Sequence, residues 1–223
     1  MNRIHGTAGA LLLGIALCPL FSNSARALPL LSEAYYDAIG SDNGQSFVEI
    51  FATPGTSLDG LLFLGVNGAN GSVAPVVALA GVVPADGLFV VADDNGDGTT
   101  SVANADLIAN FDFQNGPDSI QLVSGALESG GSVLDALAYG VFGPGEIAAG
   151  EGTPAADAPA GSSLARLFAN LDTDDNAADF GVLSAPTPGV APLLAVPEPR
   201  TALLVSIGLF ALARLGGRAG RRR

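Results

Sequence analysis

Apolar residues between positions 28 and 196 occur in short runs, and almost every run ends at Gly, Pro, Asn or Asp. The 223-residue chain contains 30 Gly and 14 Pro, and β-branched and aromatic residues supply much of each run. Turn-forming residues at such short intervals leave little room for helices, whereas short buried strands fit between them. The sequence therefore predicts an all-β protein, either a sandwich or a barrel, rather than alternating strands and helices.

Eight segments have the composition of strands. They are Leu30–Tyr36, Ser46–Ala52, Leu61–Val66, Val73–Leu79, Leu88–Ala92, Ser119–Val123, Val133–Tyr139 and Ser163–Phe168. No amphipathic helix is expected, although Asn104–Ala109 can form a single helical turn. Residues 140–161, which are rich in Gly, Ala and Pro, predict a long surface loop, and residues 186–197 predict a linker.

The charges are distributed unevenly along the chain. All nine basic residues are Arg, and between Leu28 and Val196 only Arg166 is basic, against 21 Asp and Glu, a formal net charge of −20. This segment has no basic patch that could displace counterions from a nucleic acid, which argues against nucleic-acid binding. The only His and the only Cys, His5 and Cys18, precede it. Residues 28–196 therefore have no disulfide, no Cys or His metal ligand, and no His- or Cys-based catalysis.

Residues 1–27 have the three parts of a secretory signal peptide. Arg3 lies in a short polar start, the apolar Ala8–Leu17 follows, and the small residues of Ala25–Ala27 precede a cut before Leu28. We expect signal peptidase to remove this segment from an exported protein. The alternative is an uncleaved N-terminal helix, for which the apolar run is short.

Three ordered parts make up the C-terminus. Val196-Pro197-Glu198-Pro199 cannot be helical, because each proline disfavours helix at the residue before it. The apolar Thr201–Ala213 follows, and the last ten residues contain five Arg. Counted through Gly217 the apolar part has 17 residues, the lower limit for spanning a hydrocarbon core of about 30 Å. We expect a transmembrane sorting helix at 201–217 and an Arg-rich cytoplasmic tail at 218–223; the alternative is a buried helix with a basic tail.

This tripartite end resembles the PEP-CTERM sorting signal of Gram-negative bacteria, with Arg200 at a position where Ser or Ala is frequent. The resemblance implies that an exosortase removes the tail near the sorting motif Val196, Pro197, Glu198 and Pro199. The protein would be anchored in the inner membrane before processing, and then secreted to the cell surface or extracellular matrix. Exosortase and signal peptidase are the expected processing partners, and exopolysaccharide or surface proteins are the expected binding partners.

Several short pieces, in a fixed order, carry a second resemblance. They are Leu31–Asp37, Phe47–Phe51, Val83–Ala92, Asn104–Leu107, Phe111–Leu122, Val133–Gly140, Ser163–Leu167, Asp172–Asn176 and Pro186–Gly189. Together they resemble the lamin-tail domain, an immunoglobulin-like β-sandwich found in nuclear lamins and in many secreted bacterial proteins. Ala52 departs from the pattern, which often has Asn there. The resemblance implies one domain at 28–189, followed by a linker at 190–200, and a binding or scaffolding role rather than a reaction.

The sharpest local motif is a partial calcium loop. Asp93, Asn95 and Asp97 occupy positions 1, 3 and 5 of such a loop, and Gly98 occupies position 6, where a sharp turn is needed. Position 12 is Asn104 rather than Glu, and the motif follows a predicted strand rather than a helix. It is therefore either a Ca²⁺ site, which would be the only cofactor the sequence suggests, or a polar connection whose glycines allow tight turns.

A second oxygen-rich group follows Arg166. Its members are Asp172, Asp174, Asp175, Asn176 and Asp179. It can ligate Ca²⁺, or it can form an exposed turn in which Asp side chains bond nearby amides. We expect Arg166 to pair with one of these carboxylates, because guanidinium binds carboxylates in bidentate fashion.

Glu33 and Glu49 lie on neighbouring predicted strands. Two carboxylates in this arrangement can act as acid and base in glycoside hydrolysis, or they can be capped by backbone amides or Tyr hydroxyls. We assign no catalytic residue and expect a non-enzymatic binding or adhesion module. The alternative is a secreted carboxylate-dependent hydrolase acting on matrix polysaccharide, which an enclosed cleft containing both Glu33 and Glu49 would favour.

Overall fold

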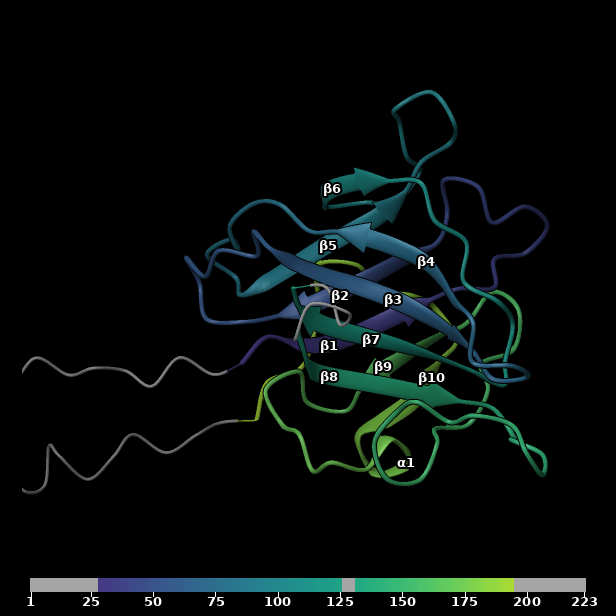
Figure 1. Cartoon of the computed structure of the whole chain (residues 1–223). Helices are drawn as coiled ribbons and strands as arrows, with labels where there is room; N and C mark the ends of the chain where they lie inside the picture. Colours follow the sequence, from purple (N-terminus) through teal and green to yellow (C-terminus); the bar gives the residue numbers. More distant parts are fainter. Residues whose placement is uncertain (1–27, 126–130, 195–223) are drawn as a thin grey trace, which may run out of the picture.

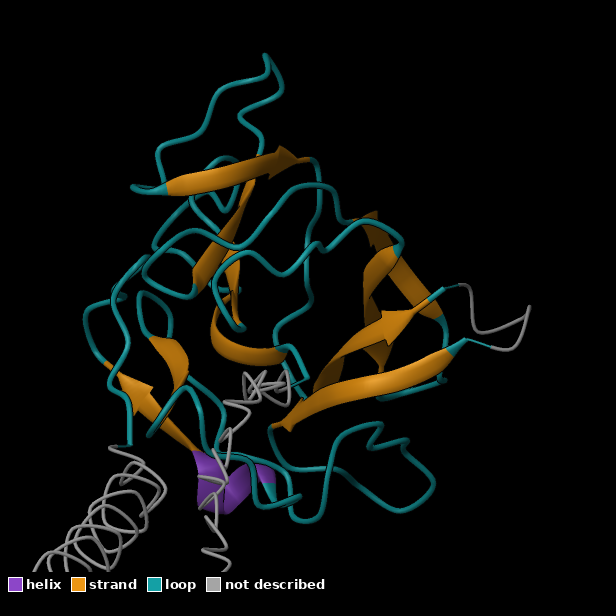
Figure 2. Ribbon diagram, turned by 90° about the vertical axis from the view of Figure 1, so that its left-hand side faces the viewer, coloured by secondary structure: helices purple, strands orange, loops and turns teal. Residues whose placement is uncertain are grey.

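Two β-sheets face each other in the computed structural model, which describes residues 28–125 and 131–194 (Figures 1 and 2). The expected signal peptide, the sorting motif and the apolar and Arg-rich tail lie outside the described residues. Within them the structure is all-β apart from one short helix, α1 (Asn176–Asp179). No helix in the described part is long and apolar enough to cross a membrane.

The larger sheet has six strands in the order β10-β9-β1-β2-β5-β6. They are β1 (Leu30–Tyr35), β2 (Phe47–Phe51), β5 (Leu88–Asp93), β6 (Ala105–Ala109), β9 (Ser163–Arg166) and β10 (Phe180–Leu183). Neighbouring strands are antiparallel, except that β6 runs parallel to β5. The chain can make this parallel connection because residues 94–104 form a long loop, which projects from the top of the molecule in Figure 1.

The smaller sheet has four antiparallel strands in the order β4-β3-β7-β8. They are β3 (Leu61–Asn67), β4 (Val73–Ala78), β7 (Asp118–Ser124) and β8 (Ser132–Tyr139). Pro75 lies in the edge strand β4, where the missing N–H costs no bond inside the sheet. At the other edge the side chain of Asn176 takes the place of a strand: its amide bonds the Ala138 N–H at 2.8 Å and the Ala136 carbonyl at 2.7 Å.

The core fills the space between the sheets. Alternate residues of each strand point into it, which buries the apolar side chains on one face of each sheet. The rings of Phe63, Phe111 and Phe113 lie 5.3 to 5.6 Å apart, and Tyr36 stacks on Tyr139 at 4.3 Å. The Tyr pair joins the end of β1 to β8 across the two sheets, and the Phe cluster packs the segment after β6 against β3.

All eight strands expected from the sequence are present, and the prediction of an all-β protein is confirmed as a two-sheet sandwich. The expectation of a helical turn at Asn104–Ala109 is wrong, because residues 105–109 form β6. These residues are extended because they pair with β5. No local sequence pattern indicates that a segment will pair in parallel with the strand that precedes it in the chain. The sequence also missed β10 and α1, which are four residues long each.

Two segments expected to be loop or linker are bound to the sandwich. In the expected surface loop 140–161, Ala155 and Ala158 are buried, and Ala155 pairs with the end of β8. The described part of the expected linker is residues 186–194, which are called the strap below. The strap lies along the outer face of the six-stranded sheet and is hydrogen-bonded to β1, β2 and Asn170.

Candidate functional site

Two glutamates lie side by side on the outer face of the six-stranded sheet. Val48 and Ile50 of β2 belong to the core, so Glu49 between them points to the opposite face. A register shift in β1 after Leu31 places Glu33 directly across from Glu49. The structure therefore brings together the two carboxylates that the sequence assigned to neighbouring strands.

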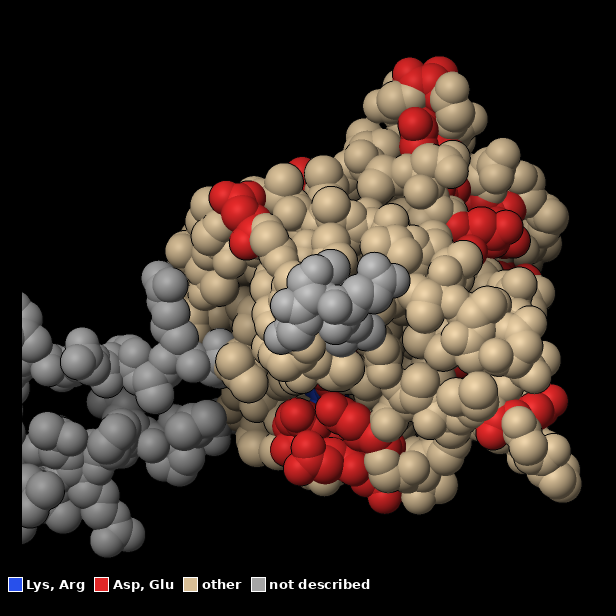
Figure 3. All heavy atoms as spheres, viewed as in Figure 1, with Lys and Arg blue, Asp and Glu red and all other residues tan. Residues whose placement is uncertain are grey.

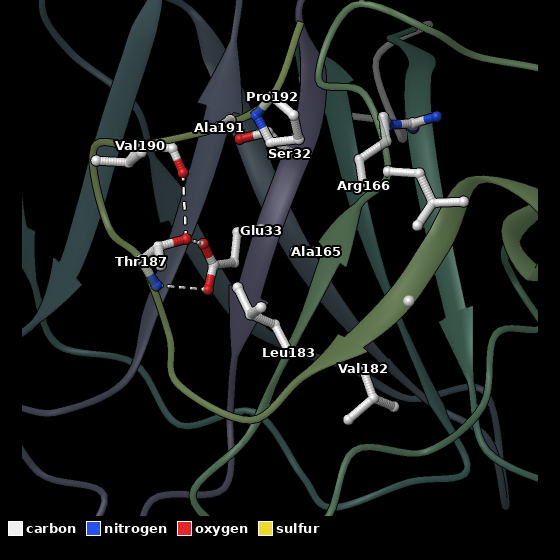
Figure 4. A pocket seen from close by; sticks show the side chains of 12 residues that line it. Ser32, Glu33, Ala165, Arg166, Val182, Leu183, Thr187, Val190, Ala191 and Pro192 are labelled. Atoms are coloured by element: carbon white, nitrogen blue, oxygen red, sulfur yellow. Dashed lines mark hydrogen bonds between the residues drawn. The ribbon is translucent and has the colours of Figure 1, made fainter.

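Glu33 is held by the strap and by β9. Its carboxylate accepts hydrogen bonds from the N–H and the hydroxyl of Thr187, both at 3.0 Å (Figure 4). It also accepts from the hydroxyl of Ser163. It lines one end of a cavity of about 190 Å³ between the strap and strands β9 and β10. The rest of that cavity is mainly apolar, and Glu33 is only 2% exposed.

Glu49 lies outside that cavity and is fully buried. One oxygen accepts from the N–H of Gly189 in the strap at 2.6 Å, and the other accepts from the hydroxyl of Ser32. Burial raises the pKa of Glu49 to about 7, against the lowering effect of these two bonds, and burial also raises the pKa of Glu33. The expected capping by backbone amides is present, and Ser and Thr hydroxyls take the place of the expected Tyr hydroxyls.

The strap is held through its backbone. Besides the N–H groups that bind the glutamates, the carbonyl of Pro188 accepts from the Asn104 side chain at 2.8 Å. Near the end of the described chain, the amide of Asn170 pairs with both backbone groups of Leu194, at 2.7 and 2.9 Å. These bonds fix residues 186–194 along the sheet, so this part of the expected linker is not a free spacer.

Gly189 is needed where the strap crosses Asn104. Its φ is 81°, and an added Cβ would lie 2.7 Å from Nδ2 of Asn104. We expect Gly189→Ala to lower the free energy of unfolding by more than the roughly 1–2 kcal/mol that left-handed backbone costs an L-residue, because it also displaces Asn104. Gly96→Ala is the matched control, since Gly96 has φ 94° and open space around it. Equal losses in urea denaturation of the two variants would contradict a tight strap contact.

The residues of the partial calcium loop make separate bonds. Asp93 is buried, and its two oxygens accept from the N–H groups of Gly44 and Phe111 at 2.8 and 3.0 Å. Asn95 and Asp97 are exposed, and both bond Thr99 instead. The structure thus places Asn95 and Asp97 around Thr99 and directs Asp93 elsewhere; a calcium ion at these three residues remains a prediction.

Arg166 forms the centre of a buried ionic group. Its guanidinium bonds both oxygens of Asp135 at 2.9 Å, Asp179 at 2.9 Å and Asp172 at 3.3 Å. It also lies 4.6 Å from the centre of the Phe180 ring. The expected pairing of Arg166 with the 172–179 group is confirmed. Asp135, its bidentate partner, was missed, although a lone acid inside an apolar strand needs a cation.

The other members of the 172–179 group serve the local fold. Asp175 caps α1 by accepting from the N–H of Ala177, and Asn176 completes the edge of β8. Asp174 is exposed and has a φ of 56°. Figure 3 shows acidic side chains gathered low on this face of the molecule, beside the position of α1 in Figure 1.

Asp135, Glu151 and Asp172 bring carboxylate oxygens within 4.8 Å of one another. Such a set can hold a hard divalent cation or share a proton. Burial, together with the charges of Asp135 and Asp172, raises the pKa of Glu151 to about 8. Its Oε2 is buried and has no hydrogen-bond partner among the described residues. Arg166 already occupies both oxygens of Asp135, which favours the proton over a cation.

We expect Glu151→Gln to stabilise the protein at pH 8–9 and to change little near pH 4. The pKa of Glu151 is raised by folding, so the folded state binds a proton that the unfolded state has lost, and stability falls as pH rises from about 5 to 8. Partial exposure screens the effect, which leaves on the order of 1–2 kcal/mol. Urea denaturation against pH measures it, with the exposed Glu146→Gln as the control. A gain at pH 4 equal to that at pH 8 would contradict the shared-proton interpretation.

Comparison of the chain with family models, with curated proteins and with solved structures found no match in any of the three.

Proposed function

We propose that this chain is a secreted, non-enzymatic binding or adhesion module, an immunoglobulin-like sandwich of the lamin-tail type. An exosortase processes it, and it is sorted to the cell surface or extracellular matrix of a Gram-negative bacterium. The observation that carries the proposal is the strap, which covers both Glu33 and Glu49 and leads directly to the sorting motif.

The covered glutamates support a binding role over a hydrolase. Acid–base hydrolysis of a glycoside needs two carboxylates that reach the same sugar. Glu33 and Glu49 are almost fully buried, and their oxygens are engaged by the chain's own N–H and hydroxyl groups. The strap would have to leave the sheet before a saccharide could reach both.

The position of the strap also supports processing by a sorting enzyme. Its last described residue, Leu194, is clamped by Asn170 and lies two residues before Val196. A cut near Val196-Pro197-Glu198-Pro199 would therefore leave the folded domain and its strap complete. A cut further upstream would uncover Glu33 and Glu49.

Intact mass of the surface-released protein tests the proposal. We expect a chain that begins near Leu28, ends between residues 195 and 200, and lacks the Arg tail. A mass that includes Arg221–Arg223 would contradict the proposed removal of the tail by a sorting enzyme. Incubating the purified domain with matrix polysaccharide tests the binding role: retention without new reducing ends supports it, and release of reducing ends would favour the hydrolase.

A further inference from the structure

An exposed apolar surface surrounds the cavity between the strap and strands β9 and β10. Leu167 after β9, Val182 in β10 and Val190 in the strap all line this cavity, and their side chains are 54%, 46% and 65% exposed. Figure 4 shows Val182 and Val190 on two sides of it. Leu193 and Leu194, also exposed, continue it where the strap runs beside residues 169–170. These five residues are called the apolar face below. Single exposed apolar residues are ordinary, but a contiguous group indicates a contact surface.

The apolar face is free of exposed charge, although its surroundings are strongly acidic. Residues 180–194 contain no Asp, Glu, Lys or Arg. Among residues 28–125 and 131–194, Glu33 and Arg166 are the only ionisable residues that line the cavity, and both are almost fully buried. Elsewhere the segment from 28 to 196 carries a formal net charge of −20. A surface of this composition offers no charged group to a charged partner, and it suits an uncharged, apolar one.

The chain leaves the domain at this surface. Leu194 is clamped to Asn170, and only six residues separate it from Thr201, where the apolar segment begins. The seven Cα–Cα steps from Leu194 to Thr201 reach roughly 25 Å at most. If Thr201–Ala213 enters a bilayer, Leu194, at one end of the apolar face, is held within that distance of the point of entry.

We propose that the apolar face rests on the lipid bilayer surface while the C-terminal segment is anchored; this rests on the membrane-anchored stage of the proposed function. Apolar side chains enter the boundary between headgroups and acyl chains, and binding grows with the apolar area that is buried. The acidic remainder of the domain faces away, because negatively charged lipid surfaces repel it. Removal of the anchor by processing then releases the domain, since five side chains alone bind weakly.

The test uses the chain 28–223, which contains no Cys because Cys18 lies in the leader. Single variants Val190→Cys and Leu167→Cys, labelled with an environment-sensitive fluorophore, are reconstituted in phosphatidylcholine vesicles. Val141→Cys is the control, because Val141 is 90% exposed and follows the end of β8, away from where residue 194 leaves in Figure 1. Leu204→Cys reports on the anchor itself.

We expect nitroxide-labelled lipid to quench the labels at 190 and 167 several-fold more than the label at 141. Quenching at 204 without quenching at 190 or 167 would overturn the proposal and leave the anchor standing. Absence of quenching at all four positions would overturn both. Quenching at 190 and 167 but not at 204 would support the lipid face and refute the anchor. The label at 190 could instead show a blue shift that depends on protein concentration and is insensitive to lipid nitroxide. That result would show that the apolar face contacts a second copy of the chain and not the bilayer, and it would overturn the proposal.

Discussion

Arg166→Met is expected to lower the free energy of unfolding by about 3–5 kcal/mol, the usual cost of removing one partner from a buried ion pair. The methionine keeps an unbranched apolar side chain in place but leaves Asp135 and Asp179 buried without a cation. Within the part of the chain that the structure describes, Asp135 then retains only the N–H groups of Leu31 and Ala136 as donors. Urea denaturation of the chain 28–194 at pH 7 measures the loss.

Asp172→Asn is the matched control for this variant. The contact between Arg166 and Asp172 is the longest of the three ion pairs at 3.3 Å, and the Asp172 side chain is 26% exposed. Solvent therefore screens the contribution of this ion pair to stability. We expect its removal to cost less than about 1 kcal/mol. If Arg166→Met lowered the free energy of unfolding no more than Asp172→Asn does, the ion pair between Arg166 in β9 and Asp135 in β8 would not stabilise the fold.

Removal of the strap is expected to have a similarly large effect. A chain ending at Ala185 loses the hydrogen bonds from Thr187 and Gly189 to the glutamates and the bonds to Asn104, Ala169 and Asn170. These are seven hydrogen bonds, so at about 1 kcal/mol net for each the loss relative to a chain ending at Leu194 is on the order of 7 kcal/mol. Neither truncation changes the net charge, because residues 186–194 are uncharged.

The strap effect should also depend on pH. Burial raises the pKa of Glu49 to about 7, so the strapped state takes up a proton that a solvent-exposed glutamate has lost. The stabilisation by the strap is therefore complete below about pH 4 and declines as pH rises through 7. Comparing the two truncations in urea at pH 5 and pH 8 checks this. A larger difference at pH 8 than at pH 5 would show that the capped glutamates remain ionised.

The sequence located eight of the ten strands because their composition and bounding turns are local properties. Asp93, Asn95 and Asp97 show the limit of such local patterns: they match a calcium loop, yet Asp93 makes its bonds to Gly44 and Phe111, which are distant in the chain. The pairing of Arg166 could be inferred because the central segment has only one base. Its choice of Asp135 could not, since that contact depends on how β9 and β8 meet across the two sheets.

The sequence by itself determined the all-β class, eight of the ten strands, the acidic charge and the placement of Glu33 and Glu49 on neighbouring strands, because these follow from composition and from the alternation of side chains along a strand. Only the tertiary structure decided what covers those glutamates. Residues 186–194 have the proline-rich composition of a spacer, and apart from the hydroxyl of Thr187 they bind the rest of the domain through backbone N–H and carbonyl groups. Contacts made by the backbone do not require a particular residue type, so the sequence carries little sign of them beyond Thr187 and Gly189.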